Sequence, residues 1–111
     1  MKKIILLLAL MAMPLLAIPA QIIAKTDGGV TSTGTISIPS GILGGVLISA
    51  DGSNAVTVIV RLNDETGKQV FDLVTKSPAL IVGPIYLEGA QTIYYSVSGT
   101  GGAAQFYEWR N

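Results

Sequence analysis

The chain has 111 residues, of which seven are basic and seven acidic, and it contains neither histidine nor cysteine. This composition excludes disulfides, a Ser-His-Asp triad, a cysteine nucleophile and the usual zinc and haem ligand sets. After Ala24 the chain carries five basic and seven acidic residues, so we expect no nucleic-acid partner, and nothing in the composition implies a cofactor.

The first 24 residues form an apolar leader. Lys2 and Lys3 precede 21 uncharged residues, Ile4 to Ala24, which is the pattern of a secretory signal peptide. Cleavage would follow Ala20 or Ala24, and neither position has a clean A-x-A sequence. A helical run of this length also spans a bilayer, so a retained membrane anchor, with membrane contact through residues 4–24, stays open. In both cases we expect an exported protein, in a virion, at the cell surface or in the extracellular space.

The rest of the chain divides into a linker and one domain. Residues 25–34 are polar and glycine-rich and predict a flexible linker. Residues 35–111 show short β-type runs between turn signals, without helical periodicity. A single open sheet would leave one apolar face wet, so we expect an all-β antiparallel sandwich or jelly-roll of seven or eight short strands. A domain this small without disulfides is expected to gain stability by oligomerising.

The strands are expected over residues 35–38, 42–49, 55–62, 68–74, 79–87 with a break at Gly83-Pro84, 91–98 and 103–110. The turn at Asp51–Asn54 predicts that strands 42–49 and 55–62 form a hairpin, with 55–62 at the centre of its sheet because its valines alternate on one face. Gly44-Gly45 indicates either a bulge or a close approach to a partner. The two final strands are expected to pair.

Three acidic residues lie in turn sequences, namely Asp51, Asp64 and Glu65. Side chains in such turns typically accept hydrogen bonds from nearby backbone amides. The spacing in DGSN and NDETG is not that of a calcium loop. We therefore expect no catalytic residue, no metal site and no enzyme activity.

The last strand is apolar on both faces. Phe106 shares one face with Glu108, while Tyr107 and Trp109 share the other. Because a C-terminal strand in a small domain is rarely internal, a second copy of the chain is the expected cover. The predicted interface comprises residues 81–87 and 104–110, with the candidate residues Ile85, Tyr86, Tyr94, Phe106, Tyr107 and Trp109.

The same aromatic residues allow another interpretation. Tyr94, Tyr107 and Trp109, with Tyr86, would form a platform on which sugar rings stack, as in a secreted carbohydrate-binding module. Such a module would be monomeric with exposed aromatics and a glycan partner. An assembly subunit would be oligomeric with Trp109 shielded.

Three turn and strand motifs follow one another along the domain. A D-G-x-N turn at Asp51 precedes the Val-rich strand, and a G-P break at Gly83 and the ending YYSVSGTG from Tyr94 follow. With these features, the stretch from about Gly41 to Trp109 resembles small β-sandwich proteins encoded among phage structural genes. The resemblance implies a noncatalytic virion component, such as a head decoration, a fibre or a tail-associated protein.

The leader departs from this resemblance, since virion proteins of ordinary tailed phages usually lack one. Either the virus has an internal membrane and the leader is an anchor, or the protein is a bacterial surface product that shares only the fold. The sequence therefore predicts a noncatalytic structural or attachment subunit of a virion or cell-surface assembly. Its partners would be further copies of itself and other structural proteins of that assembly.

Overall fold

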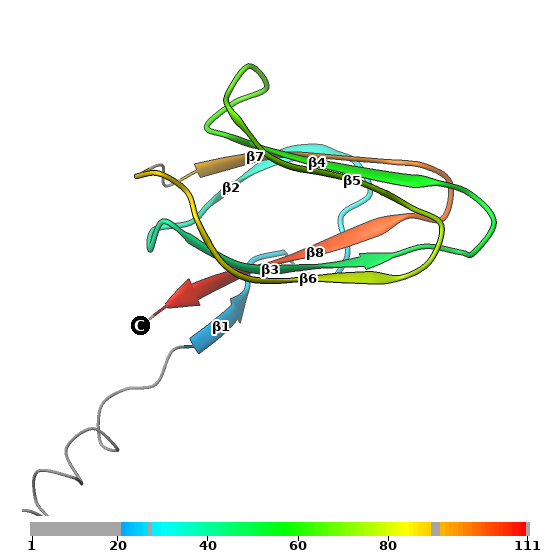
Figure 1. The fold of residues 1–111 in the computed structure, drawn as a ribbon, viewed down its shortest axis with the longest axis horizontal. Helices are drawn as coiled ribbons and strands as arrows, with labels where there is room; N and C mark the ends of the chain where they lie inside the picture. Colours follow the sequence, from blue (N-terminus) through cyan, green and yellow to red (C-terminus); the bar gives the residue numbers. More distant parts are fainter. Residues whose placement is uncertain (1–20, 27, 90–91, 111) are drawn as a thin grey trace, which may run out of the picture.

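A computed structural model describes residues 21–26, 28–89 and 92–110 of the chain (Figure 1). These residues contain eight strands: β1 (Gln21–Ala24), β2 (Thr33–Ser37), β3 (Ile42–Ser49), β4 (Val56–Leu62), β5 (Gln69–Thr75), β6 (Ala79–Tyr86), β7 (Thr92–Ser98) and β8 (Ala103–Arg110). Nowhere in these ranges is there a helix long and apolar enough to cross a membrane. The all-β prediction is confirmed.

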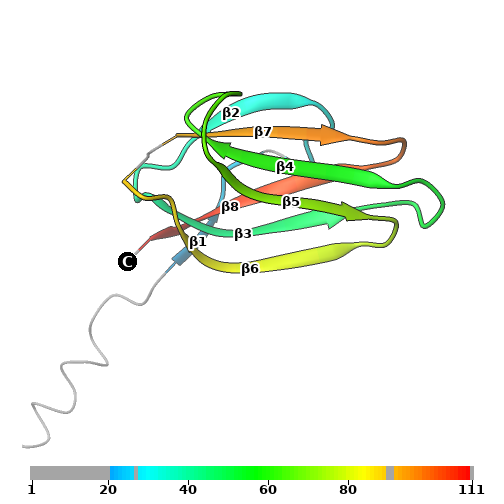
Figure 2. The same ribbon diagram turned by 45° about the horizontal axis from the view of Figure 1, so that its top comes forward.

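The strands form two four-stranded sheets that pack face to face (Figure 2). Sheet A has the order β1-β8-β3-β6, and sheet B has the order β2-β7-β4-β5. Antiparallel pairs join β1 to β8, β2 to β7, β3 to β6 and β4 to β5. The chain is therefore one nested ribbon rolled into two layers, which is the topology of a jelly-roll sandwich.

Two predicted strand pairings are wrong. β3 and β4 lie in different sheets and do not form a hairpin, and the final strands β7 and β8 also lie in different sheets. Local turn signals show where the chain reverses, but the packing of apolar faces decides which strand becomes the partner. In a jelly-roll most connections cross between the layers, and here β4 and β5 are the consecutive strands that pair.

Strand positions within the sheets give one confirmation and one correction. β4 lies between β7 and β5, so its predicted central place is confirmed. β8 lies between β1 and β3, contrary to the expectation that a C-terminal strand is not internal. Its inner face is covered by sheet B and its edges by two neighbours, so only its outer face is open to a partner.

The core lies between the sheets and follows the predicted alternation. Ile93, Tyr95 and Val97 of β7 point inward, as do the alternate valines of β4. Phe106 is fully buried, and its ring centroid lies 5.1 Å from that of Tyr95. Phe106 therefore belongs to the core of one molecule, and its prediction as a subunit-interface residue is corrected.

The N-terminal boundary differs from the expected one. Residues 1–20 of the predicted leader lie outside the described residues, and Gln21–Ala24 form strand β1 rather than a helix (Figure 1). In the segment predicted as a linker, the Lys25 N–H donates to the Phe106 carbonyl at 2.8 Å, and Val30 forms a bridge with Ala104. β2 begins at Thr33, two residues before the expected start at Thr35.

Turn aspartates bond the local backbone as predicted. The N–H groups of Ser53 and Asn54 donate to Asp51 Oδ1 at 2.8 and 2.9 Å, and these bonds hold the pKa of Asp51 below its ordinary value. In the β4–β5 turn, the Thr66 hydroxyl and N–H donate to Asp64 Oδ1, which lowers the pKa of Asp64. Glu65 lies exposed in the same turn.

Candidate functional site: the outer face of sheet A

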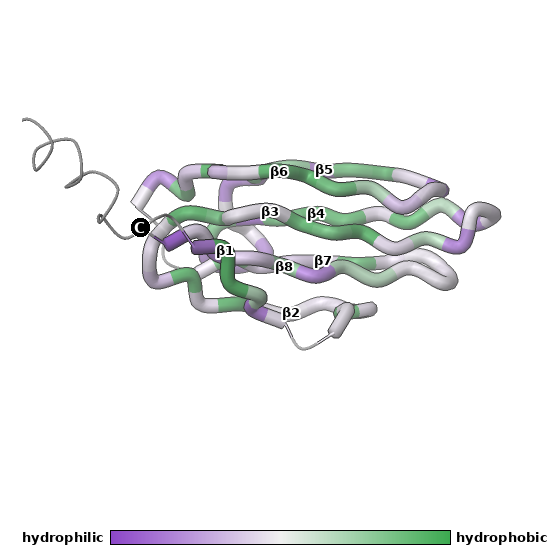
Figure 3. Tube along the Cα trace, turned by 90° about the horizontal axis from the view of Figure 1, so that it is seen from below, coloured by the Kyte–Doolittle hydropathy of each residue, from purple (hydrophilic) through white to green (hydrophobic). Residues whose placement is uncertain are grey.

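The outer face of sheet A carries an apolar groove. Strand register places Ile22 of β1 opposite Trp109 of β8, and Gly45 of β3 between Tyr107 of β8 and Val82 of β6. Figure 3 looks onto this side of the sandwich, where the four strands of sheet A lie side by side. The groove has a volume of about 390 Å³ and is lined by Ile22, Gly44, Gly45, Leu47, Leu80, Ile81, Val82, Tyr107 and Trp109.

Two glycines form the floor of this groove. The register of β3 shifts between Leu43 and Gly45 against both neighbouring strands, so the predicted bulge is confirmed. A Cβ on Gly44 would lie 3.1 Å from the backbone carbon of Glu108, and a Cβ on Gly45 would lie 2.7 Å from the Ile81 carbonyl oxygen. The close approach that these glycines permit is therefore to strands of the same sheet.

Replacing Gly45 with alanine is expected to destabilise the fold by about 1–3 kcal/mol, because the new methyl group overlaps a backbone atom that cannot rotate away. Thermal or urea unfolding measures the loss. Ser49→Ala, at an exposed position of the same strand, is the matched control and should stay within about 0.5 kcal/mol of the native protein. Equal stability of the Gly45 and Ser49 variants would contradict the described bulge.

The walls of the groove are unusually exposed for apolar side chains. Leu80 and Val82 of β6 are 62% and 73% exposed, and Ile22 of β1 is 51% exposed. The lining contains no charged residue. Contiguous apolar surface without charge is typical of the central part of a protein–protein contact.

The outer face of sheet B has a different character. Its outward positions are mainly hydroxyl-bearing or charged, and they include Thr33, Thr35, Thr57, Arg61, Asp72, Ser96 and Ser98. Val74 is its large exposed aliphatic residue, with 61% of its surface accessible. Among the described residues, the two faces of the sandwich are therefore chemically distinct, and the apolar groove lies on that of sheet A.

The predicted interface residues are divided among several places. Tyr107 and Trp109 line the groove. Ile85 packs partly against the core, and Tyr86, 71% exposed, lies beside it near the ends of β4 and β5. Tyr94 lies on the outer face of sheet B.

The sequence-based prediction missed three residues of the groove, Ile22, Leu47 and Leu80, whereas Ile81 and Val82 fall within the predicted interface segment 81–87. Two of the strands did indicate a covered outer face, because ILGGVLIS and ALIV carry apolar residues at both odd and even positions. A strand that is apolar on both faces either lies between layers or has an outer partner. Ile22 was obscured because it belongs to the apolar leader.

The proposed sugar platform does not assemble as predicted. Tyr107 and Trp109 belong to β8 in sheet A, whereas Tyr94 belongs to β7 in sheet B. The outward faces of the two sheets point in opposite directions, so these three rings cannot contact one sugar. On the outer face of sheet A, Tyr107 and Trp109 of β8 remain together, and the exposed Tyr86 lies on β6, two strands away from β8.

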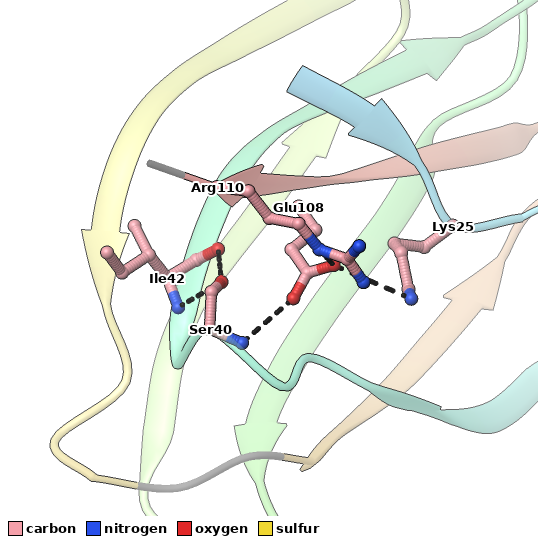
Figure 4. A network of polar contacts seen from close by, with 5 residues as sticks. All are labelled: Lys25, Ser40, Ile42, Glu108 and Arg110. Carbon is pink, nitrogen blue, oxygen red and sulfur yellow. Dashed lines mark hydrogen bonds and ion pairs between the residues drawn. The ribbon is translucent and has the colours of Figure 1, made fainter. Parts of the chain in front are cut away.

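A polar cluster lies behind the groove, on the inner face of β8 (Figure 4). Glu108 is fully buried. Its Oε2 accepts a hydrogen bond from the Ser40 N–H at 2.9 Å, and its Oε1 accepts one from Arg110 Nε at 2.8 Å. Lys25 Nζ lies 3.6 Å from Oε1. These contacts tie the chain after β1 and the turn before β3 to the last strand.

The environment of Glu108 favours its charged form. Burial raises the pKa of this carboxyl group, but the hydrogen bonds from Ser40 and Arg110 and the charge of Arg110 outweigh burial, so its pKa lies below the ordinary value. A buried carboxylate with this many partners is a structural anchor. Across the described ranges, there is no group of three or more acidic side chains that would hold a metal ion.

Comparisons with known proteins leave the chain without an assigned family. No protein-family model and no curated protein matches it. The chain is similar to part of a chain in a solved structure titled "Structure of infectious bursal disease virus Gt strain", with a TM-score of 0.30 and 13% identity. The match covers 82% of this chain and 28% of that one. At this score the likeness carries no argument about fold or function.

Proposed function

We propose that this chain is a noncatalytic structural or attachment subunit of a virion or cell-surface assembly, and that it self-associates through the groove on sheet A. One observation carries the proposal: the outer face of sheet A is apolar and uncharged along its groove, while the outer face of sheet B is mainly hydroxyl-bearing or charged. A protein whose purpose is assembly needs one such face and no reactive group.

A second copy of the chain is the occupant that this groove fits. A charged partner would bury its charge against a lining that offers no ion pair. A second copy instead brings the exposed, uncharged side chains of Leu80 and Val82 of β6, which can pack against an apolar lining without burying a charge. Two copies related by a two-fold axis would each place these side chains in the groove of the other.

The topology supports this proposal as an analogy. Jelly-rolls serve in viral capsid domains and in lectins, among other proteins, and a shared fold does not by itself assign a function. The capsid-type use needs contacts between subunits, for which the groove would be the surface. The lectin-type use needs a platform of aromatic rings, and here the candidate rings are divided between opposite faces.

Export completes the proposal. An apolar leader with two lysines would direct the chain out of the cytoplasm or hold it at a membrane, and the sandwich would then lie at a virion or cell surface. The sequence resemblance to phage-encoded sandwich proteins supports the structural role, whereas the leader departs from it and calls for a virus with an internal membrane or a bacterial surface product.

Val82→Asp is expected to weaken self-association by at least about tenfold, because a charge buried in an apolar contact costs more than about 1.4 kcal/mol. Analytical ultracentrifugation over a concentration series measures the change. Val74→Asp is the matched control: the same substitution, on the edge strand of sheet B, at a residue with similar exposure.

Two results would contradict the proposed function. The first is a native protein that stays monomeric at every concentration. The second is equal weakening of association by the Val82 and Val74 substitutions. A monomer whose Trp109 fluorescence changes on adding glycans would instead favour the carbohydrate-binding alternative.

A further inference from the structure

We propose that the exported chain is processed between Ala20 and Gln21, so that the mature protein begins at the first residue of β1. The inference rests on the proposal that the leader directs export. The sequence alone leaves two bonds open, after Ala20 and after Ala24. The structure distinguishes between the two bonds, because the two cuts would leave products that differ in whether they keep strand β1.

Cleavage after Ala24 would remove a complete strand of the sandwich. All four residues of β1 pair with β8, from Gln21 opposite Arg110 to Ala24 opposite Tyr107. Without β1, the end of β8 would become a sheet edge with unpaired backbone groups. Cleavage after Ala20 leaves all of these pairs intact.

The same cut would also damage the groove. Ile22 is one of its walls and lies opposite Trp109 in the register of β1 and β8. Its loss would uncover the side of Trp109 that faces β1. The proposed association surface is therefore complete only in a product that retains residues 21–24.

Lys25, the residue that follows the second candidate bond, is also part of the fold. Its N–H donates to the Phe106 carbonyl at 2.8 Å, and its ammonium group pairs with buried Glu108. The Ala24–Lys25 bond thus joins two residues that both contact β8. A boundary between leader and domain is expected outside such contacts.

The Ala20–Gln21 bond meets one sequence requirement of a processing site, a small residue before the cut, as the Ala24–Lys25 bond also does, and neither has a clean A-x-A sequence. Ala20 supplies the small side chain required before the cut, and Pro19 precedes it in the apolar run. Gln21 is polar and exposed, and it is the first residue of the strand. A cut at this bond would therefore fall directly before the first residue of the sheet.

The test is the intact mass of the full-length chain after expression in a secreting bacterial host. A product that begins at Gln21, with or without loss of ammonia from cyclisation of an N-terminal glutamine, is the expected result. A product that begins at Lys25, or a chain that retains Met1, would overturn the inference.

Substitutions at the two alanines sharpen the test. Ala20→Leu should block processing at Gln21, because a large side chain does not fit before the cut. Ala24→Leu is the matched control and should give the native N-terminus at Gln21. The reverse pattern would assign the site to Ala24. These readouts are masses, so a monomeric product beginning at Gln21 would refute the proposed association while leaving this inference intact.

Discussion

Phe106→Ala is expected to lower the free energy of unfolding by about 3–5 kcal/mol. The side chain is fully buried between the sheets, in contact with the ring of Tyr95, and alanine would leave a cavity that the paired strands cannot close. Small domains have only about 5–15 kcal/mol of stability. The variant should therefore unfold at a much lower urea concentration than the native protein.

The concentration dependence of this loss separates a core residue from an interface residue. If Phe106 acts within one molecule, the destabilisation is the same in dilute and concentrated samples. A loss that grows with protein concentration would indicate that Phe106 supports association instead. Val74→Ala, at an exposed position, is the control and should change stability by no more than about 0.5 kcal/mol.

Strand positions and inward faces could be predicted from the sequence because they depend on local alternation. In β4 the valines at 56, 58 and 60 share one side, and all three are buried. The strand partners could not be predicted in the same way. β3 and β4 are joined by a clear turn at Asp51, yet the apolar faces of the two strands pack across the sandwich rather than within one sheet.

Only part of the candidate site could be predicted from the sequence, again because local alternation does not show which strands share a sheet. Tyr107 and Trp109 could be identified because an alternating strand with aromatics on its second face needs a cover. Whether Tyr94 joins them depends on which sheet holds β7, and this information is not local. The role of Ile22 could not be predicted, because it belongs to a long apolar run. Such a run indicates a leader whether or not its last four residues pair with β8.

The alternation of residues along β8 predicts that Glu108 points inward, although a charged residue is not expected in a core. It shares the inward face of β8 with Ala104 and Phe106, so the pattern alone places a carboxylate in the core. Besides Arg110 on the same strand, its partners are Lys25 and Ser40, which are far away in the sequence. A buried charge is tolerated only with such partners, and their identity follows from the fold.

Glu108→Gln is expected to destabilise the protein by about 1.5–3 kcal/mol at neutral pH, the range for hydrogen bonds to charged groups. The amide keeps the shape of the side chain but loses the charge that binds Arg110 and Lys25. Both cations are partly exposed, so water compensates them in the variant. Urea unfolding at pH 7 measures the loss.

Glu88→Gln is the matched control, because Glu88 forms an ion pair with Lys68 in which both side chains are largely exposed. Exposed pairs contribute little, so this variant should unfold almost as the native protein does. Equal losses in the Glu88 and Glu108 variants would contradict the role of Glu108 as an anchor.

The difference in stability between the native protein and Glu108→Gln should depend on pH, which provides a second test of the Glu108 carboxylate. The pKa of Glu108 in the folded protein lies below its ordinary value of 4.5, so its charged form stabilises the fold above that pH. This contribution is lost as the pH falls below about 4.5 and through the folded-state pKa. Asp51 and Asp64 also titrate with lowered pKa values, but they do so in both proteins and cancel in the difference. The gap in stability between native protein and Glu108→Gln should therefore narrow on acidification, and a gap that widens would mean that burial, rather than Ser40 and Arg110, controls this carboxyl group.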